Sequence, residues 1–341
     1  MFEVMTASKA EQVAARTNEA FERLAEPLRR EIKLHCYRML GSVHEAEDLV
    51  QETYLRAWRG FDGFEGGLFR AWLYKIATNA CLNALEARKS AQRVLPDQMG
   101  SPAIGMPDGV PATEVAWLEP YPDSQLESIA DDQPNPEVRY AAREAVQLAF
   151  VAAIQQLPPR QRVALLLCDV LGWAATETAT LLGGSTASVN SALQRARETL
   201  ATRYPEGRPL AVARPSVAQQ RLLDRYLRAW EDHDLDGFVA LLKEDATFTM
   251  PPWLQWYAGR EAIRSFFAIA WQSCRGMRVI PAAANGQPAF AVYARTDADP
   301  RFTANGIHVL TLEGDRIATM TLFLEPRMFE MFGLPLVLEE S

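Results

Sequence analysis

The segment between residues 96 and 136 most limits how this chain can fold. It contains eight prolines and eight acidic residues, and neither lysine nor arginine. Proline interrupts regular structure, and a segment this polar cannot bury enough apolar surface to fold by itself. The sequence therefore predicts separate modules on either side of an acidic linker. One interpretation is a passive tether; the other is a polyanionic strand that lies in a basic channel built for nucleic acid.

Charge is unevenly distributed along the 341-residue chain, although its total is −8. The net charge is +1 over residues 1–95, −8 over 96–136, +3 over 137–214 and −4 over 215–341. Two neutral-to-basic blocks thus flank the acidic segment, so nucleic-acid binding stays compatible with the acidic total. No apolar run approaches the roughly 20 residues that span a bilayer, and the N-terminus lacks a hydrophobic signal core. We therefore expect no membrane contact.

The four cysteines are scattered, without a Cys-x-x-Cys pair or a nearby pair of histidines. This spacing argues against a zinc site and indicates a reduced compartment. We therefore expect neither a metal nor a cofactor, and we expect the protein to be cytoplasmic.

Residues 64–89 combine aromatic rings with basic side chains and predict a helix from Phe69 onward. Apolar residues recur at steps of three and four, which is the period of a helix with one buried face. The other face carries cations and amides. Proteins that bind single-stranded nucleic acid use basic side chains to contact phosphates and aromatic rings to stack on unpaired bases. An ordinary amphipathic helix with a solvated basic face is the alternative.

Residues 18–60 are also expected to be helical. In the segment HEAEDLVQETYLRAWRGF, apolar side chains that include Tyr54 and Trp58 are predicted to share one face. Acidic and amide side chains fall on the other face. That outer face either only keeps the helix in solution or docks on a basic partner surface.

Residues 137–204 predict a second helical module. Pro158 and Pro159 end one helix and open the next. A short helix, a Gly183-Gly184 turn and a last helix capped by Ser185 or Thr186 then follow in the order of a helix-turn-helix. Short polar groups and arginines on the last helix suit base edges and phosphates in a major groove, although many helical hairpins share this pattern.

After a second linker at 205–216, the pattern changes to α+β. Helices are expected around 222–230, after Asp234 and around 263–271. Strands are expected at 246–250, 288–295, 306–313 and 317–325, the last two joined by a hairpin through Gly314.

Such a fold can enclose an apolar pocket with a few polar groups. Only one histidine falls in a predicted strand, which is weak support for an acid–base pair, and we name no catalytic residue. A packed aromatic core is the alternative. The candidate pocket residues are Trp230, Asp245, Trp253, Trp256, Tyr257 and His308.

Four stretches carry a resemblance to a known family. In chain order they are EDLVQETYLRAW, FRAWLYKIATNACLN, LPPRQRVALLLCDVLGW and SVNSALQRAR, with the acidic linker between the second and the third. Over residues 18–204 the chain resembles an extracytoplasmic-function (group IV) sigma factor of bacterial RNA polymerase. Residues 217–341 resemble the SnoaL-like (polyketide-cyclase-like, nuclear-transport-factor-like) fold, in which a curved sheet and helices form a cone. Some sigma factors of this group carry such an extension.

The resemblance implies a multidomain chain with two all-α sigma domains and a C-terminal α+β cone. Sigma domain 2, which binds core polymerase and recognises and melts the minus-ten element, is expected at 15–92. The acidic linker at 93–136 is expected to thread toward the active-site and RNA-exit channels. Sigma domain 4, with its helix-turn-helix for the minus-thirty-five element, is expected at 137–204. The linker at 205–216 then leads to the SnoaL-like domain at 217–341.

The resemblance also assigns residues by position. Docking on the β and β′ subunits of core polymerase is expected from Asp48, Leu49, Gln51 and Glu52. Capture of a flipped minus-ten base and contact with the opened strand are expected from Phe64, Phe69, Arg70, Trp72, Tyr74, Lys75, Asn79, Asn83 and Arg88. Reading of the minus-thirty-five element is expected from Ser188, Asn190, Ser191, Gln194, Arg195 and Arg197.

The implied function is promoter-specific transcription initiation, with core RNA polymerase and promoter DNA as partners and no bond-making by this chain. The SnoaL-like domain is expected to regulate the sigma domains. As alternatives, it acts as a small-molecule sensor or as a hydrolase or cyclase in its own right. An anti-sigma factor or a small-molecule ligand is a further partner to be tested.

Overall fold

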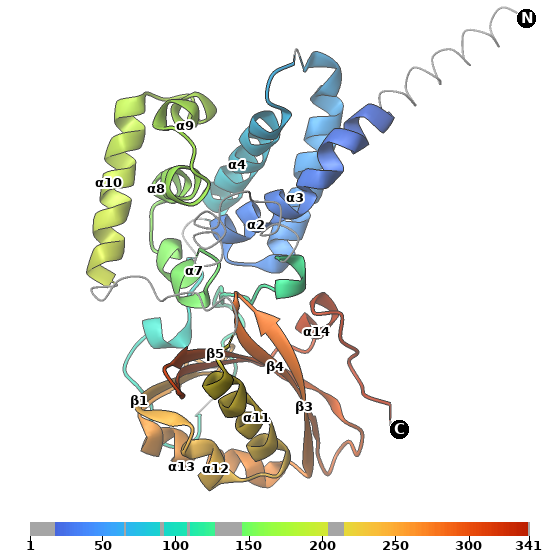
Figure 1. The fold of residues 1–341 in the computed structure, drawn as a ribbon, viewed down its shortest axis with the longest axis vertical. Coiled ribbons are helices and arrows are strands. Elements are labelled where there is room, and N and C mark those ends of the chain that lie inside the picture. The colour runs from blue at the N-terminus through green and yellow to red at the C-terminus, as the bar shows by residue number, and fades with distance from the viewer. Residues whose placement is uncertain are drawn as a thin grey trace, which may run out of the picture. The chain divides into compact units, whose positions relative to one another are not determined.

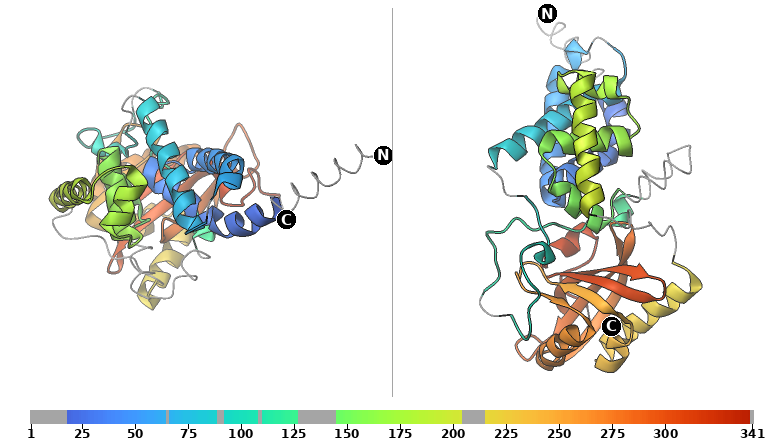
Figure 2. Two further views of the ribbon diagram at one scale, coloured as in Figure 1. Left: turned by 90° about the horizontal axis from the view of Figure 1, so that it is seen from above. Right: turned by 90° about the vertical axis from the view of Figure 1, so that its left-hand side faces the viewer.

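The structure is a computed structural model, which describes residues 18–64, 66–88, 92–107, 110–126, 145–203 and 215–339 (Figures 1 and 2). It divides into two compact units, one made of residues 1–90 and 153–207 and the other of residues 91–152 and 208–341. The first unit is helical, and the second is built around a sheet. Within the described residues, none of the helices has the length and apolarity to cross a membrane.

The described part of the first unit starts with a helix over residues 18–25 and a 3₁₀ turn at Glu26–Leu28. Three longer helices follow: α2 (Arg29–Leu40), α3 (Val43–Gly60) and, after a 3₁₀ turn, α4 (Phe69–Ala87). Gly41 ends α2 in the left-handed conformation with a φ of 70°. Ser42 then caps α3, because its Oγ accepts a hydrogen bond from the Glu45 amide at 3.2 Å. The helices predicted for this part of the chain are confirmed.

The same unit continues with α8 (Pro159–Leu165), a π turn (Leu166–Val170), α9 (Ala175–Leu182) and α10 (Thr186–Arg203). Before them lies α7 (Leu148–Gln155). Gly183 ends α9 with a φ of 63°, and the Ser185 Oγ accepts from the Ser188 amide at 3.2 Å. Ser185 is therefore the cap of α10, and the predicted helix-turn-helix order is confirmed.

In the second unit, helices α11 (Val217–Glu231), α12 (Leu235–Val239) and α13 (Arg260–Ala270) lie on one face of a six-stranded sheet (Figure 1). The strands are β1 (Leu242–Thr249), β2 (Trp256–Ala258), β3 (Gly276–Ala284), β4 (Gln287–Arg295), β5 (Thr303–Glu313) and β6 (Arg316–Phe323). They are ordered β2-β1-β6-β5-β4-β3, and α14 (Met328–Met331) follows.

Only the β1–β6 pair is parallel among the strand pairs of this sheet as described; its other neighbours are antiparallel. The predicted hairpin between β5 and β6 is confirmed by the pairing of Glu313 with Arg316. Strand β3 was not predicted. It lies at the sheet edge, where Pro281 is tolerated because the missing backbone donor leaves no broken ladder.

In the described residues between 92 and 126, the only helical elements are two 3₁₀ turns, Pro96–Gln98 and Asp123–Gln125. Nevertheless Leu118 and Tyr121 are completely buried. These residues belong to the same compact unit as the C-terminal sheet. The described part of the acidic linker is therefore not a free tether, because Leu118 and Tyr121 are buried in this unit, although Ile104 and Val110 stay exposed.

Candidate polymerase and nucleic-acid interfaces

The outer face of α3 carries three of the four residues predicted to dock on polymerase. Asp48 and Gln51 are exposed, and Glu52 is half-buried with its Oε1 accepting a hydrogen bond from Arg56 at 2.6 Å. Leu49 needs a correction, because it is only 9% exposed and belongs to the core of the helical unit. It positions α3, and the polar residues around it remain candidates for contact.

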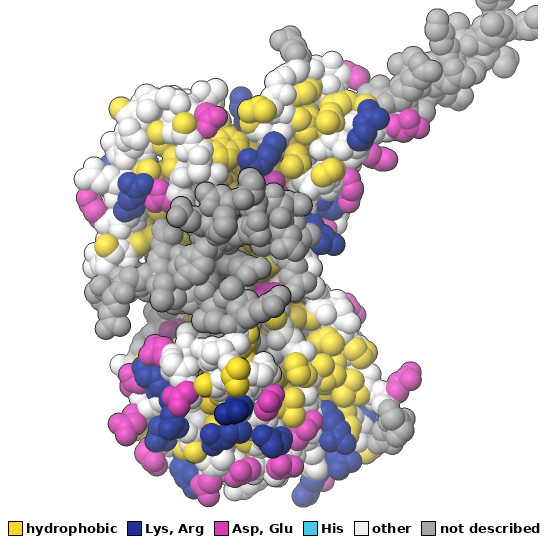
Figure 3. All heavy atoms as spheres, viewed as in Figure 1, with side chains coloured by type: hydrophobic (Ala, Val, Ile, Leu, Met, Phe, Trp, Pro, Cys, Tyr) yellow, Lys and Arg dark blue, Asp and Glu magenta, His cyan; other side chains and the backbone are white. Residues whose placement is uncertain are grey.

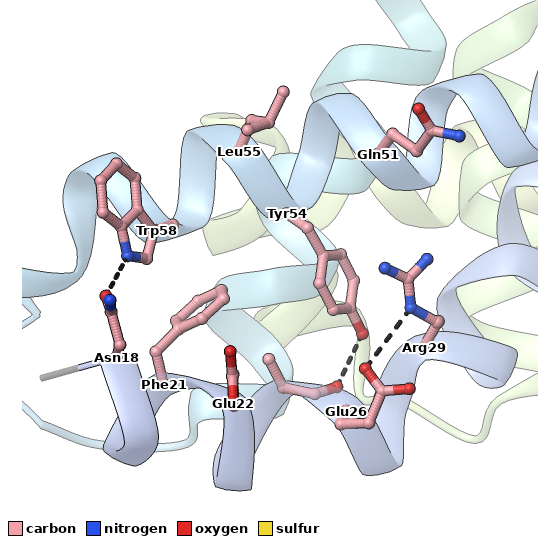
Figure 4. Close-up of a pocket in the computed structure, with 10 residues that line it drawn as sticks. Asn18, Phe21, Glu22, Glu26, Arg29, Gln51, Tyr54, Leu55 and Trp58 are labelled. Atoms are coloured by element: carbon pink, nitrogen blue, oxygen red, sulfur yellow. Dashed lines mark hydrogen bonds and ion pairs between the residues drawn. The ribbon is translucent and has the colours of Figure 1, made fainter. Parts of the chain in front are cut away.

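A groove of about 670 Å³ lies between the helix at 18–25 and α3 (Figure 4). Two hydrogen bonds hold its walls together. The Tyr54 hydroxyl donates to the Ala25 carbonyl oxygen at 2.6 Å, and the Trp58 indole donates to the Asn18 side-chain oxygen at 2.7 Å. Burial raises the pKa of Tyr54, so this hydroxyl stays protonated and acts as a donor.

Two large apolar side chains on this wall are exposed, Leu55 by 55% and Trp58 by 50%. The sequence pattern predicts Trp58 on the buried face of α3, and this prediction is wrong because Trp58 is exposed. Its exposure could have been predicted from the spacing of Gln51, Leu55 and Trp58, since steps of four and three residues place side chains on the same helix face. The candidate docking face of α3 is therefore partly apolar.

The loop before α4 is bounded by an aromatic cluster. The ring of Phe64 lies 5.6 Å from that of Phe69 and 5.1 Å from that of Trp72. Gly66 and Gly67 turn the loop with φ values of 96° and 101°, which glycine adopts without strain. Phe69 is 8% exposed and supports the cluster, whereas Phe64 and Trp72 are half-buried with ring surface available to a ligand.

Helix α4 presents Lys75, Asn79 and Asn83 at steps of four residues, and all three are exposed. They form one polar stripe along the helix, as the sequence predicted. Two predicted contact arginines are held by carboxylates. Arg70 donates from Nε to the Glu31 Oε1 at 2.8 Å, and Arg88 forms an ion pair with Glu45. Contact of these arginines with phosphate would compete with those pairs.

Tyr74 needs a correction among the predicted minus-ten residues. Its side chain is completely buried, and its hydroxyl donates to the Glu31 Oε1 at 2.8 Å. Its ring lies 5.0 Å from His35 and 5.3 Å from Trp173. Burial raises the pKa of Tyr74, so the hydroxyl remains a donor. In this structure Tyr74 supports α4 from inside, and it presents no surface to a DNA strand.

The predicted minus-thirty-five residues follow the exposed face of α10. Arg197 donates to both carboxylate oxygens of Asp169, at 3.0 and 2.6 Å, and Gln194 donates to the Glu198 Oε1 at 3.0 Å. The Ser188 hydroxyl donates back to the Ser185 carbonyl oxygen within the cap. The other three are exposed, and none of their side chains forms a hydrogen bond or an ion pair within the described part of the chain: Asn190, Ser191 and Arg195.

A buried arginine joins the segment before α8 to the end of α2. Arg162 is 2% exposed and donates to the side-chain oxygen and the carbonyl oxygen of Gln155, each at 2.7 Å, and to the carbonyl oxygen of Met39. Gln155 in turn donates to the Arg38 carbonyl oxygen at 3.0 Å. Burial lowers the pKa of Arg162 to about 10, so it remains a cation at neutral pH. Its charge is stabilised by the carbonyls at the end of α2.

The candidate pocket residues of the C-terminal domain do not come together. Trp230, Tyr257 and His308 are buried in its core, whereas the Asp245 side chain is 78% exposed beside Lys243. Trp253 and Trp256 are half-buried. The expectation of one shared pocket is therefore wrong, because aromatic rings occupy the interior and Asp245 points outward. The alternative interpretation, a packed aromatic core, is confirmed for Trp230.

Within the described ranges, no cluster of three or more histidine, cysteine or acidic side chains could hold a metal ion.

Three family models match the chain in order. Sigma-70 region 2 matches residues 24–91, Sigma-70 region 4 matches residues 147–200, and the SnoaL-like domain matches residues 223–320. The ECF RNA polymerase sigma factor SigG of Mycobacterium tuberculosis is 46% identical over 324 residues, which cover 92% of this chain and 84% of that protein. This chain belongs to the extracytoplasmic-function sigma factors. The similarity of this sigma factor to SigG includes its C-terminal extension.

Two further relatives match different shares of this sigma factor. The ECF RNA polymerase sigma factor SigW of Bacillus subtilis is 29% identical and covers 58% of this chain and 96% of its own length. The crystal structure of the extracytoplasmic function sigma factor SigJ of Mycobacterium tuberculosis aligns with a TM-score of 0.57 at 23% identity. It covers 93% of this sigma factor and 99% of that chain, which shows a shared fold for helical and C-terminal parts alike.

Proposed function

We propose that this protein binds core RNA polymerase in the cytoplasm and directs initiation at specific promoters. The observation that carries the proposal is the order of the two sigma regions, with an exposed polar stripe on α4 in the first and a capped helix-turn-helix in the second. The polymerase supplies the chemistry. This chain supplies binding energy for strand opening, because stacking of about 1–3 kcal/mol per base offsets the cost of flipping a base out of the duplex.

We assign roles to the predicted contact residues according to the solvent exposure of their side chains. Asp48, Gln51 and Glu52 dock on polymerase, and the neighbouring exposed apolar side chains of Leu55 and Trp58 enlarge this docking surface. Phe64 and Trp72 bind the flipped base of the minus-ten element, and the polar stripe of Lys75, Asn79 and Asn83 contacts the opened strand. Reading of the minus-thirty-five element falls to Asn190, Ser191 and Arg195, with Arg197 available when its pair with Asp169 opens.

We propose that the C-terminal domain regulates and does not catalyse. An acid–base pair needs two titratable groups within reach of one substrate. Here His308 is buried against Tyr226 and Trp230, and Asp245, the carboxylate predicted to join it, faces solvent. That arrangement offers no proton donor or acceptor to a bound molecule.

Run-off transcription tests the proposal directly. The full chain is added to purified core polymerase with promoter fragments from its own genome, and specific transcripts are expected only when both proteins are present. A double variant, Asp48→Lys with Gln51→Lys, reverses the charge of the docking face and is expected to abolish transcripts while leaving circular dichroism unchanged. Failure of the unaltered protein to bind core polymerase, or to initiate at any start site, contradicts the proposal.

A further inference from the structure

Leu68 lies at the end of the loop that joins α3 to α4, directly before the first helical residue, Phe69. Its side chain is 75% exposed, more than that of any other large apolar residue described in the helical unit. A methyl group added to Gly66 or Gly67 would have no heavy atom within 4 Å beyond the adjoining residues, so the loop before Leu68 stands clear of the described chain. Figure 3 shows hydrophobic side chains gathered at this end of the unit, toward the top of the view.

Leu68 is also the N-cap residue of α4, with a φ of −78° and a ψ of 98°. A short polar side chain at this position bonds a free amide of the first turn, as Ser42 does for α3 and Ser216 does for α11. Leu68 makes no such bond. The chain therefore keeps an apolar residue where solvation and helix stability both favour a polar one. A conflict of this kind between local preference and sequence is expected at functional positions.

One helical turn separates Leu68 from a ring that we assign to the flipped minus-ten base. The Trp72 amide donates to the Leu68 carbonyl oxygen at 3.1 Å, and the Trp72 ring lies 5.1 Å from that of Phe64. A helical turn rises about 5.4 Å, and successive bases of one DNA strand lie about 3.4 Å apart along the axis. When Phe64 and Trp72 hold a base, its neighbour in the strand is therefore within reach of Leu68.

The position of Leu68 on α4 favours DNA as its partner. Steps of four, three, four and four residues lead from Leu68 along one helix face, so the side chains on that face form a continuous surface. They are Trp72, Lys75, Asn79 and Asn83. Between Leu68 and Asn83 the chain contains no acidic residue. Apolar side chains, leucine among them, enter DNA between base steps and keep those steps unstacked.

We infer that Leu68 is a wedge, which enters the base stack at the place that the flipped minus-ten base leaves. This inference rests on the proposed function, because only a chain that opens promoter DNA meets such a gap. Phe64 and Trp72 hold the base outside the stack, and Leu68 fills the space inside it. Capture and wedge are thus separate contributions to strand opening. Without the wedge, the neighbouring bases stack on each other again and the duplex closes.

The test uses the full chain with Leu68→Ser, which removes the wedge and supplies a hydroxyl suited to capping α4. Leu68→Met keeps an unbranched apolar side chain of similar volume. Val217→Ser is the matched control, because Val217 is 72% exposed at the first residue of α11. Three quantities are measured for each variant: the urea midpoint of the helical unit by far-UV circular dichroism, the affinity for core polymerase by fluorescence titration, and the permanganate reactivity of the bubble.

Leu68→Ser is expected to keep or raise the urea midpoint and to leave the affinity for core polymerase unchanged. On duplex promoters its permanganate reactivity should fall about tenfold, because unstacking a base step is costly without a wedge. Leu68→Met and Val217→Ser should both open promoters as the unaltered protein does. A variant that is at least as stable and yet opens less DNA cannot be explained by a structural role of Leu68.

A promoter with mismatched bases in the minus-ten segment separates the wedge from base capture. Its bases are already unpaired and cost less to unstack, so Leu68→Ser should initiate there as well as the unaltered protein. Failure of Leu68→Ser on this template would assign Leu68 to base capture and overturn the wedge.

Three other results would also overturn it. Unchanged permanganate reactivity on duplex promoters would show that Leu68 does not contribute to opening. Weaker binding to core polymerase would assign Leu68 to docking, and a lower urea midpoint would assign it to the fold. If the unaltered chain opens no promoter, the proposed function fails and the wedge fails with it. If the wedge alone is wrong, the unaltered protein and Leu68→Ser open duplex promoters alike.

Discussion

The hydroxyl of Tyr226 lies 2.6 Å from Nδ1 of His308 in the interior of the C-terminal domain. Both side chains are completely buried, and the ring of Trp230 lies 4.4 Å from that of His308. Burial lowers the pKa of His308 to about 3. The imidazole is therefore neutral at physiological pH and acts as a structural group. Because folding keeps it neutral, its burial contributes to the pH dependence of the stability of this domain.

The C-terminal domain is expected to lose stability as the pH falls below about 6.5. Unfolded His308 binds a proton near that pH, whereas folded His308 binds one only near pH 3, so protons favour the unfolded state between these values. The expected slope from this group is about 1.4 kcal/mol per pH unit. Native-state hydrogen exchange of β4 and β5 at pH 5–7, corrected for intrinsic rates, measures it. His308→Asn should flatten the curve, and equal slopes in the two proteins would contradict the assignment.

Replacing Arg162 by methionine is expected to destabilise the helical unit by about 3–5 kcal/mol, because buried carbonyl groups of Met39, Gln155 and Leu157 lose their donor. Urea denaturation followed by far-UV circular dichroism measures the loss. Arg160→Met is the matched control, since Arg160 is exposed two residues earlier in α8 and should change stability by less than about 0.5 kcal/mol. Similar losses in both variants would show that the buried guanidinium is unimportant.

The variant Tyr74→Phe distinguishes a role of Tyr74 in stabilising the helical unit from a role in contacting promoter DNA. The hydroxyl is buried on Glu31, so its loss should cost about 1 kcal/mol of stability and leave promoter opening unchanged. Denaturation and permanganate footprinting of the transcription bubble measure the two effects. Loss of the bubble in a variant that remains folded would mean that Tyr74 leaves the core to meet DNA.

Trp72→Ala should have the opposite pattern. Its half-buried ring completes the cluster with Phe64 and Phe69, and a stacked base is worth about 1–3 kcal/mol. We expect the variant to bind core polymerase normally and to lose permanganate reactivity of the bubble at least tenfold. Trp173→Ala, an aromatic change outside this cluster, is the control. An unchanged footprint in Trp72→Ala would remove Trp72 from strand opening.

Arg195→Ala is expected to weaken promoter binding by the polymerase complex and to reduce the salt dependence of binding by about one ion, because an exposed arginine on α10 is suited to a phosphate. Filter binding across a range of NaCl concentrations measures the slope. Arg221→Ala, at an exposed position of α11, should leave the slope unchanged. If the two variants behave alike, α10 does not contact phosphate through Arg195.

Most of the fold can be predicted from helical periodicity and from the residues at turns. Steps of three and four residues predicted α3, α4 and α10, and the Glu313–Arg316 hairpin followed from its turn residues. Strand β3 escaped because Pro281 and a run of alanines obscure its alternation. Strand β2 escaped because three residues are too few to show a period.

The candidate sites were less predictable, because helical spacing cannot say what covers a face. Leu49 and Tyr74 lie close to polar candidates in sequence but point inward, and Trp58 was assigned to the wrong side of α3. The attachment of the linker was invisible for a different reason. Tyr121 meets Asn285 across 164 positions, and a peptide held by backbone groups leaves no compositional trace.

The pairing of Tyr121 with Asn285 also has a consequence for synthesis of the protein. The ribosome makes the linker first and reaches the residue that holds it 164 positions later. At 5–20 residues per second, this interval lasts roughly 8–33 s. During that time the acidic segment of a nascent chain lacks the Asn285 contact that it has in the finished molecule.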